Sequence, residues 1–453
     1  MVLQQETIVA CATPAGESAI AMLRLSGPLC PKIVCSAFDR TSVPTARTAV
    51  YSAYHDTEGC LLDHVIYTYY APGRSYTGSA MLEISCHGNT YIARKLLEDL
   101  IARGCRIATP GEFTRNAFLN GKLDLSQAEA VMDIVRARSD RALQAAQRQL
   151  SGALGNTVAQ FSEQLIQIVA EVEAYIDFPE EDLPTENTEG PVAKIKNLLS
   201  ELTKLEQTQA YSTLLHEGIS TVILGAPNVG KSSLLNTLTG EDRAIVSAQP
   251  GTTRDFIAER IQIGPYWLRI IDTAGLRTEA SGIERLGIEK TFEKIHEADC
   301  FLLVLDSTTA PPELPEDIKG HLQAGKVLVI ENKIDLPESR CQATFLPDCT
   351  HCRLSLLTGE GVSELRTHII HLAETDTAVP TEDTLIVNAR HAAALRKTCK
   401  ALQEALAKLM VSEYSELVAS DLHEAMEALG EIVGKIENET MLDRLFGRFC
   451  IGK

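Results

Sequence analysis

The sequence lacks the features that would mark a membrane protein, a secreted protein or a general nucleic-acid binder. No apolar window approaches the roughly 20 residues that a membrane-spanning helix needs. The first residues, Met1–Glu6, contain neither the basic start nor the apolar run of a signal peptide. Positive charge is also scarce: 42 Lys and Arg stand against 61 Asp and Glu, a net charge of -19. Any nucleic-acid contact must therefore use local basic patches or a basic partner protein.

Cysteine is plentiful but is not arranged for metal binding. The twelve cysteines, in a chain without a secretion signal, are typical of reduced thiols in a cytoplasmic protein. Cys349-Thr350-His351-Cys352 resembles half a zinc site, but no second cysteine pair with zinc spacing occurs. The motif therefore does not predict a structural metal.

A glycine-rich loop, Gly225–Ser233, is the clearest functional signal in the chain. It follows the β-branched run Thr221–Leu224 and leads into the helical leucine pattern of Leu234–Leu238. Strand, loop and helix in this order are the context of a P-loop, in which backbone N–H groups and the helix N-terminus hold a triphosphate. We expect Lys231 to reach the β- and γ-phosphates and the Ser232 hydroxyl to bind Mg²⁺.

Two later segments complete a phosphate site. The strand Leu268–Ile271 ends in Asp272-Thr273-Ala274-Gly275, where the aspartate can hold Mg²⁺ through water and the glycine N–H can meet the γ-phosphate. Gly251–Asp255 is typical of a switch segment, in which Thr253 adds a second hydroxyl to Mg²⁺.

The nucleotide base is predicted by a run that follows a further strand, Lys326–Ile330. In Asn332-Lys333-Ile334-Asp335, the last carboxylate can accept hydrogen bonds from the N1–H and 2-amino groups of guanine. Adenine offers neither donor, so ATP would leave that carboxylate unpaired, and the run predicts GTP. Ser355-Leu356-Leu357 would close over the base, although Leu356 occupies a position where such proteins usually carry a small residue.

The site lacks the usual water-orienting glutamine. Gly275 is followed by Leu276, whose apolar side chain cannot orient an attacking water. The domain therefore uses another catalytic group, or hydrolyses slowly and acts as a switch. The nearby candidates, which can equally be surface charges of a loop, are Arg254, Arg277, Glu284 and Arg285.

The rest of the chain predicts two further kinds of structure around this site. With 453 residues, 45% of them hydrophobic, the chain is too long for one core and predicts several ordered domains. An α+β domain is expected in 1–120, with strands at Ile8–Ala12, Ala19–Leu25, Val65–Tyr70 and Met81–Ser85 and a helix at Tyr91–Arg103. Helical stripes in 121–215 and 377–453 predict one discontinuous helical domain, with a nucleotide domain of mixed or parallel sheet inserted at 216–376.

Two details of the first helical segment yield specific expectations. Ser126 and Glu129 have the spacing of a capping box that begins a helix. Four arginines in this segment can touch a nucleic acid or a partner, or form a solvated face, which is the commoner role of such a row. They are Arg136, Arg138, Arg141 and Arg148.

The order of these motifs resembles the MnmE (TrmE) family of tRNA modification GTPases, and the resemblance covers essentially the whole chain. It rests on the Gly251–Asp255 and Asp272–Gly275 motifs and on the closing Cys-x-Gly-Lys of Phe449–Lys453. Supporting stretches are Ala12–Pro14, Leu23–Gly27, Ser75–Gly78, Phe118–Asp124 and Ile176–Asp182.

The resemblance implies a function beyond nucleotide binding. Such proteins act with the flavoprotein MnmG (GidA), in a heterotetramer-type complex, on the wobble uridine (position 34) of certain tRNAs. Together they install a carboxymethylaminomethyl or aminomethyl group on C5 of the base. The N-terminal domain dimerises and holds a tetrahydrofolate one-carbon donor, of the 5-formyl or 5,10-methylene type. By motif, the folate-contacting positions are Arg24, Glu83, Lys122 and Lys453.

The resemblance also implies that K⁺ replaces the missing glutamine and that Glu284 orients the attacking water. The matching K⁺ ligands are Asn228, Ser247, Gln249 and Thr252. Taken together, the residues expected at GTP are Asn228, Val229, Gly230, Lys231, Ser232, Ser233, Ser247, Thr252, Thr253, Asp272, Thr273, Ala274, Gly275, Asn332, Lys333, Asp335, Ser355, Leu356 and Leu357.

Two questions stay open at this level. Cys450, near the C-terminus, can be a nucleophile, a folate-pocket thiol or part of a packed tail, and Lys453 is the only neighbour that could favour its thiolate. The competing functions are a regulatory G protein, such as one assisting ribosome assembly, and a GTP-dependent metal chaperone or scaffold. The first lacks the N-terminal domain and the Cys450–Lys453 tail, and the second needs a metal-ligand cluster that this sequence does not show.

Overall fold

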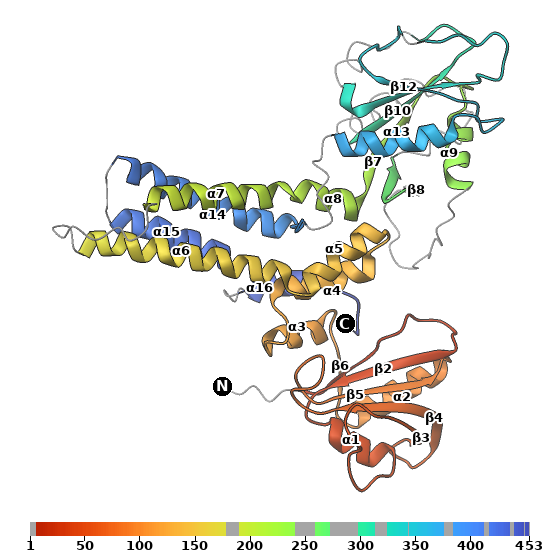
Figure 1. Ribbon diagram of the computed structural model, residues 1–453. Coiled ribbons are helices and arrows are strands. Elements are labelled where there is room, and N and C mark those ends of the chain that lie inside the picture. The colour runs from red at the N-terminus through yellow and green to blue at the C-terminus, as the bar shows by residue number, and fades with distance from the viewer. Residues whose placement is uncertain are drawn as a thin grey trace. The chain divides into compact units, whose positions relative to one another are not determined.

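The fold was analysed in a computed structural model. The residues it describes are 6–177, 190–240, 259–271, 298–312, 324–342, 344–375, 384–411, 416–434, 439–447 and 449–452. They form two compact units, each built on one six-stranded sheet (Figure 1). One unit comprises Met1–Val135, Ala146–Leu199 and Ala394–Lys453, and the other comprises Arg136–Ala145 and Ser200–Ala393.

The sheet of the first unit has the strand order β3-β4-β5-β2-β1-β6. Its strands are β1 (Ile8–Cys11), β2 (Ile20–Ser26), β3 (Ala49–His55), β4 (Leu61–Tyr70), β5 (Met81–His87) and β6 (Arg106–Ile107). The accompanying helices are α1 (Cys30–Ala37), α2 (Thr90–Ala102) and α3 (Glu112–Leu119). The four strands and the helix expected here are confirmed, whereas β3 and β6 were not predicted.

The period of two along β2 decides which side chains leave the core. Leu23 and Leu25 are fully buried in the cluster that contains Leu96 of α2. Arg24, between them, therefore projects from the opposite face. In the antiparallel register of β2 and β5 it lies beside Glu83.

Seven further helices of the described chain lie between residues 121 and 207 or after residue 388. They are α4 (Leu125–Arg136), α5 (Asp140–Leu150), α6 (Ala153–Asp177), α7 (Pro191–Gln207), α14 (Ala389–Met410), α15 (Glu416–Gly430) and α16 (Glu439–Phe446). Helices α6 and α15 pack against each other although the nucleotide-binding segment separates them in sequence (Figure 1). This pairing confirms a helical domain made from two chain segments. Within the described residues no helix, α6 included, is both long and apolar enough to cross a membrane.

The expected capping box at Ser126 is wrong by two residues. The Asp124 carboxylate accepts a hydrogen bond from the Gln127 N–H at 2.8 Å, and the Gln127 side chain accepts one from the Asp124 N–H at 2.9 Å. Asp124 therefore caps α4, because a carboxylate oxygen serves this position as well as a hydroxyl does. Ser126 instead donates its hydroxyl to Asp124.

The sheet of the second unit has the order β12-β11-β10-β7-β9-β8, parallel except for β8. Its strands are β7 (Ile219–Leu224), β8 (Glu259–Ile263), β9 (Tyr266–Ile270), β10 (Cys300–Asp306), β11 (Val327–Asn332) and β12 (Thr350–Arg353). The helical elements are α8 (Gln209–Glu217), α9 (Lys231–Gly240), the short 3-10 helix η1 (Ala324–Lys326) and α13 (Val362–Thr375). Separate apolar clusters cover the two faces of β10 and β11, which explains their uninterrupted hydrophobic sequences. The carboxyl ends of β7, β10 and β11 consequently meet at one edge, where such sheets bind ligands.

Candidate functional site

The P-loop prediction is confirmed as a strand, a loop and a helix. β7 ends at Leu224, α9 begins at Lys231, and the loop between them contains three residues with positive φ, Gly225 at 148°, Asn228 at 64° and Gly230 at 111°. A Cβ on Gly230 would lie 2.4 Å from Nδ2 of Asn332. Only glycine therefore allows the loop to approach the end of β11 this closely.

The side chain of Lys231, the first residue of α9, folds back over this loop. Its ammonium donates hydrogen bonds to the carbonyl oxygens of Gly225, at 2.8 Å, and Ala226, at 2.7 Å. Burial lowers its pKa. A half-buried cation whose partners among the described residues are neutral carbonyls is a suitable partner for a phosphate oxygen. The donor set thus fits an anionic ligand over the loop.

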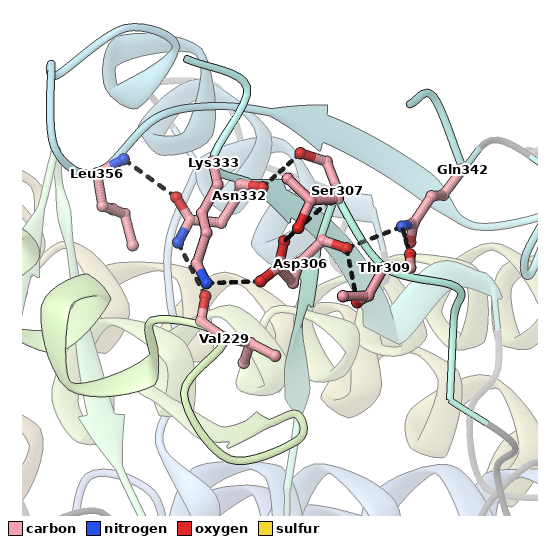
Figure 2. Close-up of polar contacts among 9 residues, drawn as sticks. Val229, Asp306, Ser307, Thr309, Asn332, Lys333, Gln342 and Leu356 are labelled. Carbon is pink, nitrogen blue, oxygen red and sulfur yellow. Dashed lines mark hydrogen bonds and ion pairs between the residues drawn. The ribbon is translucent and has the colours of Figure 1, made fainter. Parts of the chain in front are cut away.

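Asn332 joins the three segments of the site (Figure 2). Its Nδ2 donates to the carbonyl oxygen of Val229 at 2.8 Å, and its Oδ1 accepts from the Leu356 N–H at 3.1 Å. Its own carbonyl accepts from the Ser307 N–H at 3.0 Å and from the Ser307 hydroxyl at 2.7 Å. One buried amide therefore holds the phosphate loop and the base segment in fixed relation.

Lys333, the next residue, forms an ion pair that the sequence analysis did not anticipate. Its Nζ lies 2.5 Å from Oδ2 of Asp306, the last residue of β10 (Figure 2). Burial alone would raise the pKa of Asp306, but the bonds from Lys333 and Thr308 outweigh burial and lower it. Gln342 donates to the backbone carbonyls of Asp306 and Thr309 and ties this strand end down. The only sequence signal for Asp306 was a charged residue that ends a buried apolar strand.

The residues expected at the base differ in exposure. Asp335 is exposed, whereas Ser355 is buried. The side chain of Leu356 packs against the main core cluster of the unit, which explains an apolar residue where a small one was expected. Leu357 is 87% exposed. Asp335 and Leu357 are therefore accessible to a ligand. Ser355 and Leu356 instead anchor the segment 355–357 to the interior of the unit.

Several expected residues lie outside the described part of the chain. They are Ser247, Gln249, Thr252, Thr253, Arg254, Asp272, Thr273, Ala274, Gly275, Leu276, Arg277, Glu284, Arg285 and Lys453. Their expected roles stay predictions. Of the residues expected at Mg²⁺ or K⁺, the structure describes Ser232 at the start of α9 and Asn228 in the loop; both are exposed.

The Cys-Thr-His-Cys run is part of the sheet, because Thr350–Arg353 is β12. Cys352 belongs to the apolar cluster on one face of the sheet, and Cys349 packs against the cluster on the other. The two thiols therefore point away from a common ligand. The His351 ring contacts Glu331 through Nδ1 and the Leu346 carbonyl through Nε2.

Two of the helix arginines, Arg138 and Arg141, are exposed and also contact side chains of their own unit. The Arg141 guanidinium donates to the Tyr211 hydroxyl at 3.1 Å and to the Tyr266 hydroxyl at 3.2 Å. Arg138 lies over the Trp267 ring, 5.6 Å from its centroid. Both side chains are occupied within their own unit, since aromatic faces and hydroxyls stabilise a guanidinium as well as water does.

A second constellation lies on the exposed face of the N-terminal sheet. The Arg24 guanidinium contacts Oε1 of Glu83 through Nε at 2.9 Å and through Nη2 at 2.8 Å. It also donates to the carbonyl of Gly452 at 3.1 Å and lies 5.9 Å from the Phe113 ring centroid. Tyr70 donates its hydroxyl to the other carboxylate oxygen of Glu83 at 3.0 Å. The structure thus brings together Arg24, Glu83 and the C-terminal tail.

The tail reaches this face because aromatic residues anchor it. Phe446 and Phe449 are buried in a cluster with Leu125 of α4. Gly452 has φ 95°, and a Cβ there would lie 2.9 Å from the Cα of Ala12. A larger residue would therefore displace the tail. Cys450, between these anchors, is exposed.

Lys122 lies against a different part of the N-terminal unit. Its Nζ donates to the carbonyl of Gly73 at 2.6 Å, in the loop between β4 and β5. Asn120 donates to the carbonyl of Thr77 in the same loop at 2.6 Å. The Thr77 hydroxyl bonds in turn to Ser26 of β2 at 2.7 Å, so Lys122 and Arg24 belong to one connected face.

Comparison with known proteins identifies the family. The family model for the MnmE helical domain matches residues 125–450, and the model for the GTP-binding protein TrmE N-terminus matches residues 7–122. A curated protein of Opitutus terrae, named tRNA modification GTPase MnmE, is 47% identical over 452 residues, 99% of each chain. The chain belongs to the MnmE family. An MnmE protein of the same description from Akkermansia muciniphila is 41% identical, again over 99% of each chain.

Among solved structures, the G domain of the FeoB iron transporter of T. maritima is similar over 34% of this chain and 98% of that domain. It has 28% identity and a TM-score of 0.25. Membership of the MnmE family makes the P-loop unit a GTPase domain and assigns the remaining domains to the TrmE N-terminus and the MnmE helical fold.

Proposed function

We propose that this protein is a K⁺-stimulated GTP hydrolase that acts with the flavoprotein MnmG on the wobble uridine of certain tRNAs. Together they would install a carboxymethylaminomethyl or aminomethyl group on C5, with a tetrahydrofolate derivative as one-carbon donor. In this proposal the chain is a homodimer with domains at 1–120, 121–215 with 377–453, and 216–376. The observation that carries it is the Asn332 amide, which joins a phosphate loop to a guanine-recognition segment.

The described residues support separate roles in GTP binding. Lys231 supplies a cation above the loop, and the N–H groups of the first turn of α9 point toward the same space. Exposed Asp335 would accept both donors of the guanine edge. Mg²⁺ would be held by Ser232 together with Thr253, and bound Mg²⁺ neutralises charge on the transferred phosphate.

A bound K⁺ would take the place of the glutamine that is missing at Leu276. It would add positive charge near the transferred phosphoryl group. Asn228 is exposed and holds φ 64°, a conformation that asparagine tolerates better than most residues. Its side-chain amide oxygen could therefore reach a cation bound beside the loop. Ser247, Gln249 and Thr252 would complete the K⁺ site, and Glu284 would orient the attacking water.

Steady-state GTP hydrolysis in K⁺ and in Na⁺ tests this proposal. We expect K⁺ to raise kcat by about tenfold or more over Na⁺, and Asn228→Ala to remove the difference, because a fixed cation near the phosphoryl group stabilises the transition state. Asn236→Ala, at an exposed asparagine on the following helix, is the matched control and should keep K⁺ stimulation. Equal, slow rates in both salts would favour a regulatory G protein of the ribosome-assembly type.

The Arg24 face supports the one-carbon part of the proposal. Arg24 and Glu83 are 22% and 18% exposed, so both can reach a ligand while staying preorganised by each other. A carboxylate that can accept two N–H bonds suits the amino-pyrimidine edge of a folate. Lys122 and Lys453 would also contact the bound folate. The exposed Cys450 would place a thiol beside it.

Binding of 5-formyltetrahydrofolate to the full-length protein tests this face. We expect Arg24→Ala to weaken binding by about tenfold or more, because Glu83 then loses its partner and the tail loses its anchor. Arg94→Ala is the control, since Arg94 is an exposed arginine of the same domain that pairs only loosely with Glu98 at 3.7 Å. Wild-type protein that binds no folate would contradict the modification function.

A further inference from the structure

A fully buried carboxylate precedes the base-recognition run by one residue. The side chain of Glu331, on β11, is 0% exposed. Its Oε1 lies 3.0 Å from Nδ1 of His351, and its Oε2 lies 3.3 Å from Nε of Arg353. Burial of a carboxylate is costly unless the charge is paired, and the four preceding residues of this strand, Val327–Ile330, are all apolar. The proposed nucleotide chemistry uses none of these three side chains.

The two ring nitrogens of His351 each face an oxygen. One faces the Glu331 carboxylate and the other faces the carbonyl oxygen of Leu346 at 3.3 Å. A carbonyl and an ionised carboxylate both accept hydrogen bonds, so the ring can donate to both only when it carries both protons. The imidazolium then also neutralises the buried carboxylate. Its side chain is 15% exposed, so solvent protons can reach it.

Three successive links lead from this pair to the base segment. The Glu331 side chain holds His351, the Glu331 carbonyl accepts from the Leu354 N–H at 2.9 Å, and Asn332 accepts from the Leu356 N–H. The segment 351–356 is thus bonded to the last two residues of β11, Glu331 and Asn332, at positions 351, 354 and 356. The first link is the only one of the three that depends on a titratable group.

The other charged groups near the pair are already engaged or lie at its margin. Arg353 on β12 is 46% exposed, while Lys333 on β11 pairs with Asp306 at the end of β10. Asp348, in the segment before β12, lies close enough to Cys349 to contribute, after burial, to the raised pKa of that thiol. Within the described residues, His351 is therefore the cation that both touches the buried carboxylate and bonds to a second segment.

We propose that Glu331 and protonated His351 are positioning residues for guanine recognition, which makes guanine-nucleotide affinity depend on pH. While the ring carries both protons it joins β11, β12 and Leu346, and the segment over the base is held. Loss of one ring proton at higher pH would remove the bond to Leu346 and loosen the segment. The inference rests on the proposed GTPase function, because it assigns Ser355–Leu357 to the base.

Fluorescence titration of full-length protein with a labelled GDP, from about pH 6 to about pH 8, tests the pair. We expect wild-type affinity to fall as pH rises. His351→Gln keeps one donor toward Glu331 but cannot carry charge, so it should bind GDP roughly tenfold more weakly at low pH and match wild type at high pH. Arg353→Gln, which removes the other cation beside Glu331 but not the link to Leu346, should keep the pH dependence.

A second variant and two readouts keep the test decisive. Glu331→Gln should also flatten the pH profile, because it removes the charge that holds the imidazolium, and it replaces His351→Gln if that variant does not fold. A lowered Tm in either variant with an unchanged pH profile would mean a purely structural role and would overturn the inference. Wild type without preference for GDP over ADP would instead overturn the proposed GTPase function, so the two failures are distinguishable.

Discussion

Replacing Asp335 by asparagine is expected to change the nucleotide specificity of the protein from guanine to xanthine. In the proposed site the carboxylate accepts hydrogen bonds from N1–H and the 2-amino group of guanine, whereas an asparagine amide would direct its N–H₂ at one of those donors. Xanthine carries a carbonyl in place of the 2-amino group and can accept from that amide. Because unpaired polar groups in a base site are strongly rejected, GTP affinity should fall by about 100-fold or more while XTP affinity rises.

Competition binding with GTP and XTP measures this change in the full-length protein. Because Asp335 is exposed, its replacement should leave the fold intact, and unfolding followed by circular dichroism checks this. Glu338→Gln, an exposed carboxylate three residues on, is the matched control and should retain the preference for GTP. A variant at Asp335 that kept wild-type GTP affinity would show that the base is recognised elsewhere.

Replacing Lys231 by alanine is expected to reduce kcat/KM for GTP by about 100- to 1,000-fold. The ammonium is held over the loop by two carbonyl oxygens and carries the one positive charge that the described part of this loop directs at a phosphate. Alanine removes that charge but keeps the helix, since it is a strong helix former at the first position of α9. The loss should appear in both binding and turnover.

The burial of Lys231 also decides the pH at which its variant should be measured. Burial lowers its pKa, so the loss should be measured at neutral pH, where the wild-type ammonium stays charged. Lys400→Ala, at an exposed lysine of α14, controls for a general effect of removing positive charge. Undiminished turnover in the Lys231 variant would contradict the assignment of Gly225–Ser233 as the phosphate-binding loop.

Much of the nucleotide site could be predicted because its signals are local. A strand, a glycine loop and a helix follow one another within about twenty residues, and Asn332-Lys333-Ile334-Asp335 follows directly on a buried strand. Backbone conformation and the order of donors and acceptors are set by neighbours in sequence, so the pattern alone predicts the ligand. The same holds for the acidic composition and for the absence of a long apolar run.

One error arose where a local pattern fitted two neighbouring positions. The Ser126–Glu129 spacing suited a capping box, but Asp124 and Gln127 have the same spacing and a better-placed carboxylate. The sequence contained this alternative, and only the backbone path distinguished it.

The sequence by itself determined the family, the phosphate loop and the choice of guanine. The tertiary structure decided which side chains meet: Lys333 with Asp306, Glu331 with His351, and Arg24 with the carbonyl of Gly452, which lies 428 residues away. These contacts join strands and segments that pair only after the sheet has formed and the helices have packed. No spacing along the chain encodes them, because a contact across a fold depends on strand order, register and face rather than on neighbours in sequence.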